Sequence, residues 1–353
     1  MKIDIVHPGY YPLHATDFDS VGLGGNDTGM VLAARGLARR GHQVRVFAHC
    51  DPHTDQGVTW LNLHDLYPRE HRDVVIFWVR TRRVDASQFN APVRVAKLGL
   101  KKPNIELLAQ VQRGEINLLL AFSSFQRDRY CQRYHFPAEA NWVVTADGLD
   151  ISYYPPGPVK QPGKVLHAAN PDRGLKLVLD VWPAIRQRHP EATLTIASSY
   201  LLRGISAEED LQKGGHLYER ARRMSGLGVA YLGRLSKPEL IRHQLSAQVY
   251  LYPTTYEETC CIAALEAAAA SEVIICSPSG ALPDRVRHGV TGLLISGDPA
   301  DPPVRDRFAA ETVRVLNDRD LLTHLAAEAR ILAQTHDYTS VLTTWEDSFA
   351  RLL

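Results

Sequence analysis

The sequence predicts an α/β protein built from two facing, Rossmann-like domains, each with a doubly wound and mostly parallel sheet. Apolar strand-like runs alternate with helix-like segments along the chain, which is typical of a parallel sheet covered on both faces. The 353 residues exceed what one ordinary core accommodates. A stretch rich in proline and glycine at 153–164 divides the alternation in two. We expect an N-terminal domain over 1–155 and a C-terminal domain over 163–337.

The first half of the chain begins with a β-α-β unit. Residues 2–7 and 43–48 read as short buried strands, and residues 28–40 between them repeat apolar side chains at helical spacing up to Gly41. Further strands are expected at 58–61, 74–79, 93–97, 118–122 and 142–145.

The second half restarts the same alternation. Helices are expected at 174–187 and 238–245, and strands at 164–167, 193–198, 229–232 and 248–252. The last segment, 338–353, is an amphipathic helix with Trp345 on its apolar side.

Composition excludes several classes of protein. The 40 basic and 39 acidic residues give a net charge of +1, so no overall field attracts a nucleic acid or an anionic membrane. No apolar run approaches the roughly 20 residues of a membrane-spanning helix. Five unpatterned cysteines and no secretory leader favour a reducing, cytoplasmic location with free thiols.

The most informative stretch is 252–286, which contains a strand end, a turn with Glu257 and Glu258, and a helix from about Cys260 that carries Glu266. A helix N-terminus favours an anion such as a diphosphate. Carboxylates accept hydrogen bonds from hydroxyls, and two oxygens suit a pair of neighbouring hydroxyls on a sugar. The spacing E-x7-E therefore predicts a ligand with a diphosphate at the helix N-terminus and hydroxyl groups on either side of it, next to Glu258 and Glu266. A nucleotide sugar has this order of groups. The simpler alternative is an amphipathic helix with two solvated glutamates.

The same stretch resembles a known family. Pro253–Ala267 reads P-T-T-Y-E-E-T-C-C-I-A-A-L-E-A, and Gly280–Asp284 reads G-A-L-P-D. This resembles the retaining family-4 glycosyltransferases of the GT-B fold, whose pattern is P-S-x-x-E-G-F-G-L-x-x-L-E-A followed by G-G-x-x-E. The segment Thr259-Cys260-Cys261 replaces Gly-Phe-Gly. The resemblance implies a GT-B fold with the C-terminal helix 338–353 crossing back to the first domain, and chemistry without a metal or other cofactor.

The resemblance also implies a donor site. Arg173-Gly174 stands where the family has the Lys-Gly that holds the diphosphate, whereas Ala168 and Ala169 occupy the place of an earlier Gly-Arg. Lys176 is a candidate substitute for the missing cation. Glu258 would orient the donor hexose as the catalytic residue, and Glu266 would bind the ribose. The full set of expected donor-binding residues is Gly24, Gly25, Arg173, Lys176, Gly233, Arg234, Glu258, Thr259, Cys260, Cys261, Ile262 and Glu266.

The glycines in the loop before residue 28 can be compared with the G-x-G-x-x-G motif of dinucleotide-binding proteins. Gly22-x-Gly24 lacks the third glycine and starts some 15 residues after the strand, which argues against a dehydrogenase. Gly24 and Gly25 match the Gly-Gly of the family instead. The same loop offers Tyr10, Tyr11 and His14 as candidates for acceptor binding. The triplet Asp17-x-Asp19 is similar to a metal-binding motif of other glycosyltransferases, but no metal site is expected.

A basic cluster in the first half has two readings. It is either a solvated face, or a site for an anionic acceptor or for peripheral contact with a membrane that carries a lipid acceptor. Its members are Arg80, Arg82, Arg83, Arg94, Lys97, Lys101 and Lys102.

The sequence thus favours a retaining glycosyltransferase of class EC 2.4. It would move a hexose or an N-acetylhexosamine from a nucleotide-diphosphate sugar of the UDP or GDP type to a hydroxyl of a small molecule, a lipid or a polysaccharide. Two alternatives stay open. One is a GT-B-shaped epimerase or phosphorylase, and the other is a non-catalytic binder of nucleotide sugars.

Overall fold

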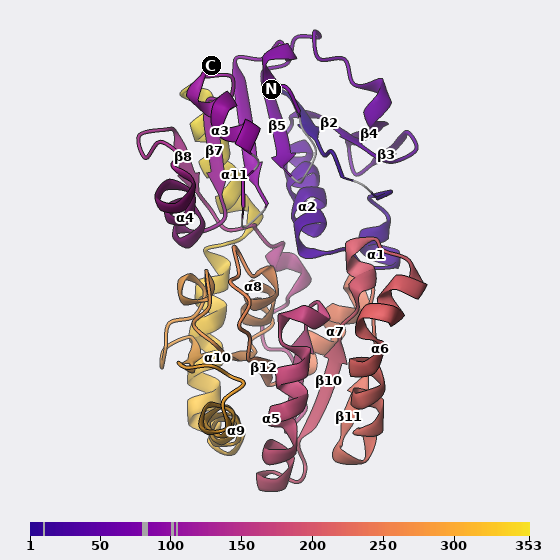
Figure 1. Cartoon of the computed structure of the whole chain (residues 1–353), viewed down its shortest axis with the longest axis vertical. Coiled ribbons are helices and arrows are strands. Elements are labelled where there is room, and N and C mark those ends of the chain that lie inside the picture. The colour runs from indigo at the N-terminus through magenta and orange to yellow at the C-terminus, as the bar shows by residue number, and fades with distance from the viewer. Residues whose placement is uncertain (10, 80–83, 100–101, 104) are drawn as a thin grey trace. The chain divides into compact units, whose positions relative to one another are not determined.

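The computed structural model describes residues 1–9, 11–79, 84–99, 102–103 and 105–353 (Figure 1). The chain forms two compact units. Each is an α/β unit with a mainly parallel sheet, so the predicted fold class is confirmed. Unit 1 comprises Met1–Phe18, Asn26–Leu149 and His336–Leu353, and unit 2 comprises Asp19–Gly25 and Asp150–Thr335.

The sheet of unit 1 has eight strands in the order β3-β4-β2-β1-β5-β6-β7-β8. All neighbours are parallel except β3, which pairs antiparallel with β4. Every strand predicted in the first half is present, and β3, a short polar edge strand, was not predicted. The strands are β1 (Lys2–Val6), β2 (Gln43–Ala48), β3 (His53–Asp55), β4 (Val58–Asn62), β5 (Val74–Val79), β6 (Val93–Leu98), β7 (Leu118–Ala121) and β8 (Trp142–Val144).

The helices of the first half lie between its strands in the chain, and α11, from the end of the chain, joins them in unit 1. The α-helices are α1 (Asp17–Ser20), α2 (Gly25–Arg39), α3 (Ile105–Gln112), α4 (Ser124–Tyr134) and α11 (Tyr338–Ala350), and the 3₁₀ helices are η1 (Leu63–Asp65) and η2 (Ala86–Gln88).

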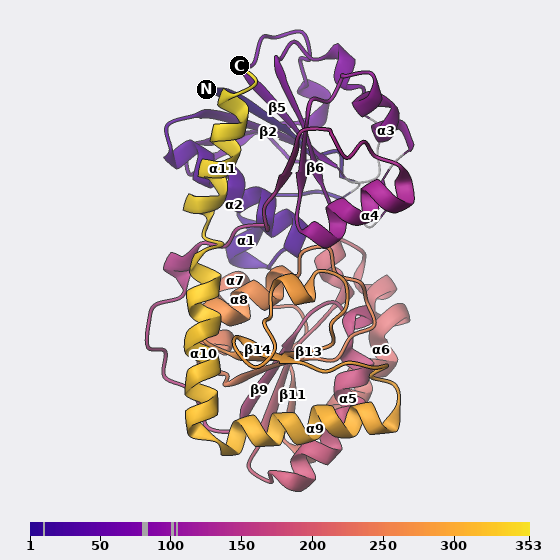
Figure 2. The same cartoon turned by 90° about the vertical axis from the view of Figure 1, so that its left-hand side faces the viewer.

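Helix α11 lies beside α2 within unit 1 (Figure 2). The Tyr338 hydroxyl donates to the carbonyl oxygen of Gly29 at 2.6 Å. Gly36 of α2 lets the two helices approach closely, because a Cβ atom there would stand 2.6 Å from Cδ1 of Leu342. The Leu149 amide also donates to the His336 carbonyl at 3.1 Å. The last 18 residues are therefore an integral part of unit 1.

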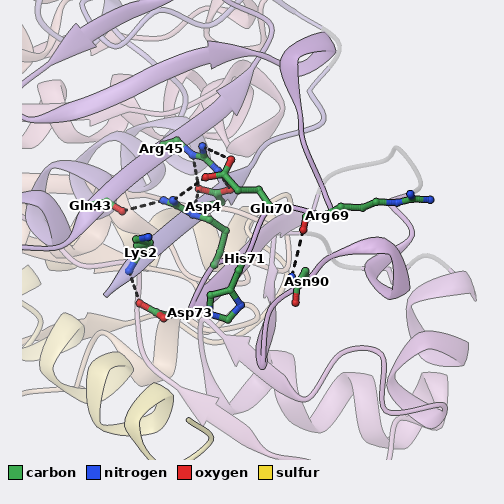
Figure 3. A network of polar contacts seen from close by, with 10 residues as sticks. Lys2, Asp4, Gln43, Arg45, Arg69, Glu70, His71, Asp73 and Asn90 are labelled. Carbon is green, nitrogen blue, oxygen red and sulfur yellow. Dashed lines mark hydrogen bonds and ion pairs between the residues drawn. The ribbon is translucent and has the colours of Figure 1, made fainter.

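A network of charges stabilises one end of the unit 1 sheet (Figure 3). The Asp4 carboxylate on β1 accepts hydrogen bonds from Nε and Nη2 of Arg45 at 2.9 and 2.8 Å. Nε of Arg72 lies 2.9 Å from the same carboxylate. Glu70 supplies a second anion to the network by accepting from Nη1 of Arg45 at 2.8 Å. Asp4 is buried, so these partners offset the cost of removing its charge from water.

Unit 2 contains a six-stranded parallel sheet in the order β11-β10-β9-β12-β13-β14. Its strands are β9 (Lys164–Ala168), β10 (Thr193–Ala197), β11 (Val229–Tyr231), β12 (Val249–Tyr252), β13 (Val273–Cys276) and β14 (Gly292–Leu294). Its helices are α5 (Leu175–Arg188), α6 (Ala207–Arg223), α7 (Lys237–Ser246), α8 (Ile262–Ala269), α9 (Pro302–Asn317) and α10 (Arg319–Gln334), with 3₁₀ helices η3 (Ile151–Tyr153), η4 (Pro171–Arg173), η5 (Tyr200–Arg203), η6 (Ser225–Leu227) and η7 (Leu282–Asp284).

The core of unit 2 joins the central strands to α5 and α9. Trp182 and Phe308, one from each helix, are completely buried against Val165, Val249 and Val273 of the sheet. Because both elements are apolar on the face that meets the sheet, their burial supplies much of the stabilisation of this unit.

Two cations hold the carboxyl end of α8. Nζ of Lys160 donates to the carbonyl oxygen of Ala270 at 2.6 Å, and Arg330 donates to the carbonyl oxygen of Ala269. Cations are favourable at a helix C-terminus, where the carbonyl groups lack partners within the helix. These contacts fix the short helix whose other end adjoins the predicted donor site.

Candidate functional site

The candidate site lies where the strand order of the unit 2 sheet reverses. Strands β9 and β12 are neighbours in the sheet, although two strands and three α-helices separate them in the chain. The loop after β9 carries Arg173, and the loop after β12 carries Glu258. In open α/β sheets this switch point, at the carboxyl ends of the strands, is where ligands bind.

Arg173 and Glu258 form a close ion pair. Nη1 of Arg173 donates to both carboxylate oxygens of Glu258, at 2.7 Å to Oε1 and 2.6 Å to Oε2. The guanidinium carbon also lies 3.8 Å from the ring centroid of Tyr256, a cation–π contact. Burial is the largest single influence and lowers the pKa of Arg173, but the charge of Glu258, the nearby Tyr252 and Tyr256 and the hydrogen bond to Glu258 together outweigh burial, so the net pKa is raised. Arg173 therefore remains a cation at the base of this site.

Glu258 has a second hydrogen-bond donor that the sequence analysis missed. The hydroxyl of Tyr252, the last residue of β12, donates to Oε1 of Glu258 at 2.5 Å. Only 3 % of Glu258 is exposed, so its carboxylate depends on these partners rather than on water.

The segment after β13 supports the backbone of the Glu258 turn. The Ala281 amide donates to the carbonyl oxygen of Glu258 at 2.8 Å, and Nε of Arg285 donates to the carbonyl oxygen of Cys260 at 3.1 Å. Gly280 has a positive φ of 62°, and a Cβ atom there would lie 2.3 Å from the Glu258 carbonyl oxygen. Glycine is required at this position by conformation and by space.

The turn enters α8 through Cys261, which has a φ of 60° and precedes the first helical residue, Ile262. Cys260 and Cys261 are both buried. Burial raises the pKa of the Cys261 thiol well above its ordinary value. Cys261 is therefore a neutral, packed thiol and not a nucleophile at neutral pH.

Glu266 lies inside α8 and is held from α7. It forms an ion pair with Nζ of Lys237 and accepts a hydrogen bond from Nε2 of Gln244 at 3.3 Å. Gln244 in turn accepts from the Tyr154 hydroxyl at 3.1 Å. The two glutamates of the E-x7-E motif are thus buried and paired, in contrast to the alternative in which both are solvated.

Three other predicted donor-binding residues have different surroundings. Nζ of Lys176 lies 2.7 Å from Asp180 on the exposed side of α5, so it pairs with its own helix and not with the Arg173–Glu258 pair. Gly233 has a positive φ of 71°. Nε of the neighbouring Arg234 donates to the carbonyl oxygen of Gly22 at 3.1 Å.

The glycines of the first-half loop make close approaches within unit 2. A Cβ atom on Gly25 would lie 2.8 Å from Cγ2 of Ile262, and one on Gly24 would lie 2.6 Å from the carbonyl oxygen of Leu202. The sequence analysis assigned the loop to the range 1–155, but Asp19–Gly25 groups with unit 2. Glycine is required at position 24, because the obstacle is a backbone oxygen, whereas at position 25 the obstacle is a side-chain methyl group. The contact of both glycines with donor phosphates stays a prediction.

Among the described residues, no contact joins the predicted acceptor residues Tyr11 and His14. Tyr10 lies outside the described residues, Tyr11 is exposed, and the His14 ring stands 6.1 Å from the ring of His53. Of the basic cluster, Arg80, Arg82, Arg83 and Lys101 also lie outside the described residues. Lys97 is completely buried, so the reading of it as part of a solvated face is wrong.

Unit 1 has polar pairs at the carboxyl ends of its strands that the sequence did not reveal. Nε2 of His7 lies 3.2 Å from Asp27, Nε1 of Trp78 donates to Asn26 at 3.1 Å, and Nζ of Lys97 lies 3.2 Å from Asp147. Each pair joins residues far apart in the chain, so no local motif signals it.

The described ranges contain no group of three or more histidine, cysteine, aspartate or glutamate side chains arranged to hold a metal ion. Within the same ranges, every helix is too short or too polar to span a bilayer.

Comparisons with known proteins indicate a family and a fold. Residues 163–318, less than half of the chain, match the family model described as Glycosyl transferases group 1. A GDP-mannose-dependent alpha-(1-6)-phosphatidylinositol monomannoside mannosyltransferase of Mycobacterium tuberculosis is 27 % identical over 232 residues, which are 59 % of this chain and 54 % of the relative. The chain thus spans about half the length of that relative. A putative glycosyltransferase of Bacillus subtilis, YtcC, is 24 % identical over 338 residues, 82 % of this chain and 78 % of the relative.

A solved structure extends the likeness to the whole chain. Alr3699/HepE of Anabaena, in complex with UDP and glucose, superposes with a TM-score of 0.70 at 16 % identity and covers 99 % of both chains. At this identity the likeness shows the fold. The protein therefore has the GT-B fold, and its residues 163–318 are similar to the glycosyl transferases of group 1.

Proposed function

We propose that the protein is a retaining glycosyltransferase. It transfers a hexose or an N-acetylhexosamine from a nucleoside-diphosphate sugar of the UDP or GDP type to a hydroxyl group. The observation that carries this proposal is the Arg173–Glu258 ion pair at the switch point of the unit 2 sheet. Glu258 lies four residues before Ile262, the first residue of α8. A cation beside a helix N-terminus suits a diphosphate, and a buried carboxylate suits a sugar hydroxyl. The family match over 163–318 supports the same reading.

Unit 2 binds the donor in this proposal. Arg173, the amides at the start of α8 and those of Gly24 and Gly25 stabilise the diphosphate. Glu258 orients the hexose and Glu266 the ribose. Lys176 adds positive charge to the diphosphate subsite. The backbone at Gly233 and Arg234 lies along the nucleobase, and Thr259 to Ile262 form the turn that the diphosphate approaches.

The chemical step is a transfer of the anomeric carbon between two oxygens. The acceptor oxygen bonds to that carbon on the face from which the diphosphate departs, the bond from carbon to the phosphate oxygen breaks, and the acceptor proton passes to the departing phosphate. Preorganised donors stabilise the charge that develops on the diphosphate, which lowers the barrier without a metal ion.

Unit 1 binds the acceptor, with Tyr11 and His14 as candidate contacts. The names of the relatives cover different acceptor classes, since one is a phosphatidylinositol monomannoside mannosyltransferase and another a glycogen synthase. A small molecule, a lipid and a polysaccharide all fit the proposal for this chain, which we place in the cytoplasm.

A donor panel tests the proposal. The melting temperature is measured with UDP, GDP, TDP and ADP and with their sugars, because a ligand that binds only the folded state raises it. We expect one nucleoside diphosphate and its sugar to raise the melting temperature. A panel without any shift contradicts the proposal.

The bound donor then separates the alternatives. Release of the nucleoside diphosphate in the presence of a cell extract supports transfer. Conversion of the donor to an epimer without release indicates an epimerase, and binding without either change indicates a non-catalytic binder.

A further inference from the structure

The Tyr252 side chain is a buried hydrogen-bond partner of Glu258. Its ring is buried at the end of β12, and its hydroxyl donates to Oε1 of Glu258 at 2.5 Å across a six-residue turn. We propose that Tyr252 is a positioning residue that fixes the direction in which the Glu258 carboxylate meets a hydroxyl of the donor sugar. This inference rests on the proposed function, because it assigns a partner to the residue that would contact the sugar.

Two other rings lie close to the Tyr252 ring. The ring centroid of His167, from β9, lies 5.9 Å away with an interplanar angle of 29°. The Tyr250 ring lies 5.6 Å away at 28°. His167 cannot turn easily, since its Nδ1 is 3.1 Å from the Leu251 carbonyl oxygen. The position of the Tyr252 hydroxyl is therefore restricted by its neighbours on the inner strands β9 and β12.

The contacts around the carboxylate limit what it can still accept. An ionised carboxylate has about four acceptor positions, two on each oxygen. Tyr252 and Arg173 occupy the two positions of Oε1, and Arg173 occupies one of Oε2. One position on Oε2 remains. Glu258 is thus arranged to accept one sugar hydroxyl, and not the pair of neighbouring hydroxyls expected from the sequence.

The contributions of Tyr252 and Arg173 differ in kind. Arg173 supplies the positive charge that balances Glu258, and one nitrogen shared between both oxygens allows the carboxylate to turn about its last bond. Tyr252 binds only Oε1 and so distinguishes the two oxygens. Loss of the Tyr252 hydroxyl should leave the charge of Glu258 balanced by Arg173. It should remove the contact that fixes the orientation of the Glu258 carboxylate.

The test compares Tyr252→Phe with Tyr250→Phe. Both variants remove the hydroxyl of a buried tyrosine from the same strand, but the Tyr250 hydroxyl bonds a backbone carbonyl and not Glu258. Calorimetry measures the affinity for the nucleoside diphosphate and for its sugar, both identified by the donor panel, and steady-state kinetics give kcat and KM. We expect Tyr252→Phe to weaken binding of the nucleotide sugar about fivefold to tenfold, to lower kcat, and to leave the affinity for the nucleoside diphosphate unchanged. Tyr250→Phe should leave the ratio of the two affinities as in the wild type.

The role of Tyr252 is overturned if its variant weakens both ligands equally or if Tyr250→Phe has the same effect, since either result indicates only a structural contribution. It is also overturned if the wild type binds the nucleotide sugar and Tyr252→Phe changes neither affinity nor kcat. A wild type that binds no nucleotide sugar contradicts the proposed function itself, so the two failures are distinguishable.

A second measurement holds even if Tyr252→Phe does not fold. Donor analogues that each lack one sugar hydroxyl are compared on the wild type and on Glu258→Gln. In the wild type, loss of the hydroxyl that Glu258 binds should weaken the affinity for the donor. In Glu258→Gln, loss of that one hydroxyl should no longer matter, whereas loss of any other hydroxyl should have the same effect as in the wild type. If the substitution abolishes the effect of two neighbouring hydroxyls, Glu258 does not have the single free position inferred here.

Discussion

Nζ of Lys97 lies 3.2 Å from Oδ1 of Asp147, and both side chains are buried in unit 1. The ammonium group also lies 3.1 Å from the ring centroid of Phe122 and between the rings of Trp78 and Trp345. A lysine in an aromatic enclosure needs a nearby anion, because an unpaired charge is costly to bury. The pair therefore ties β6 to the segment that precedes the second unit.

Removal of this anion should destabilise the protein strongly. We expect Asp147→Leu to lower the free energy of unfolding by about 3–5 kcal/mol, because it removes an anion that lies 3.2 Å from a completely buried cation. Urea unfolding followed by tryptophan fluorescence measures the change. The control is Glu209→Ala, which breaks the exposed pair of Glu209 with Lys213 at 2.5 Å and should cost less than about 0.5 kcal/mol. Equal costs for the two variants would contradict a stabilising role for the buried pair.

Cys261 should be unusually tolerant of glycine. It adopts a φ of 60°, a conformation that costs a residue with a Cβ atom about 1–2 kcal/mol. Cys260 is equally buried but has no positive φ. Cys261→Gly should therefore cost about 1–2 kcal/mol less than Cys260→Gly in the free energy of unfolding, measured in urea for both variants. If Cys261→Gly is the more harmful of the two, strain at this position is not significant.

Protonation of His167 should lower stability in acid. Burial lowers the pKa of His167 to about 4, whereas an unfolded chain has a histidine pKa of about 6.5. Between these values the unfolded state binds more protons, so the free energy of unfolding rises with pH. A fall from pH 6.5 to pH 4 should cost up to about 3 kcal/mol through this group. Urea unfolding at several pH values should show a shallower loss in His167→Gln, and parallel curves for the two proteins would argue against this contribution.

Conservative changes at the two glutamates should separate their roles. Gln keeps the size of the side chain but removes the charge that pairs with Arg173 or Lys237. We expect Glu258→Gln to lower turnover about tenfold or more, which is about 1.4 kcal/mol of barrier, and Glu266→Gln to weaken donor binding. Initial rates and donor affinities measure both. The site assignment fails if both variants are fully active and circular dichroism shows them folded.

The fold was predictable because its signal is local. Runs such as Val74–Val79 and Val273–Cys276 are continuously apolar, as strands buried on both faces are, and helical spacing separates them. Proline and glycine at 153–164 indicated the change between the two halves. The segment Asp19–Gly25 was not assignable in this way, since its grouping with unit 2 depends on contacts with residues such as Leu202 and Ile262 that are distant in the chain.

The candidate site was predictable in its residues but not in its contacts. Arg173 was named from its place in the family pattern, and Glu258 and Glu266 from their E-x7-E spacing; their roles toward a donor stay predictions. Their partners Tyr252, Lys237 and Gln244 read in the sequence as ordinary strand and helix residues. A tyrosine at the end of an otherwise apolar strand was the one available signal, because a buried hydroxyl requires a partner.

The return of α11 to unit 1 has a consequence for how the protein is made. Residues 336–353 leave the ribosome only after all of unit 2 has been translated, yet Tyr338 and Leu342 pack directly on α2. Unit 2, whose sheet, helices α5–α10 and core are nearly continuous in the chain, can acquire its structure during translation. Unit 1 must wait for its final helix, so the half of the protein that emerges first is the half that matures last.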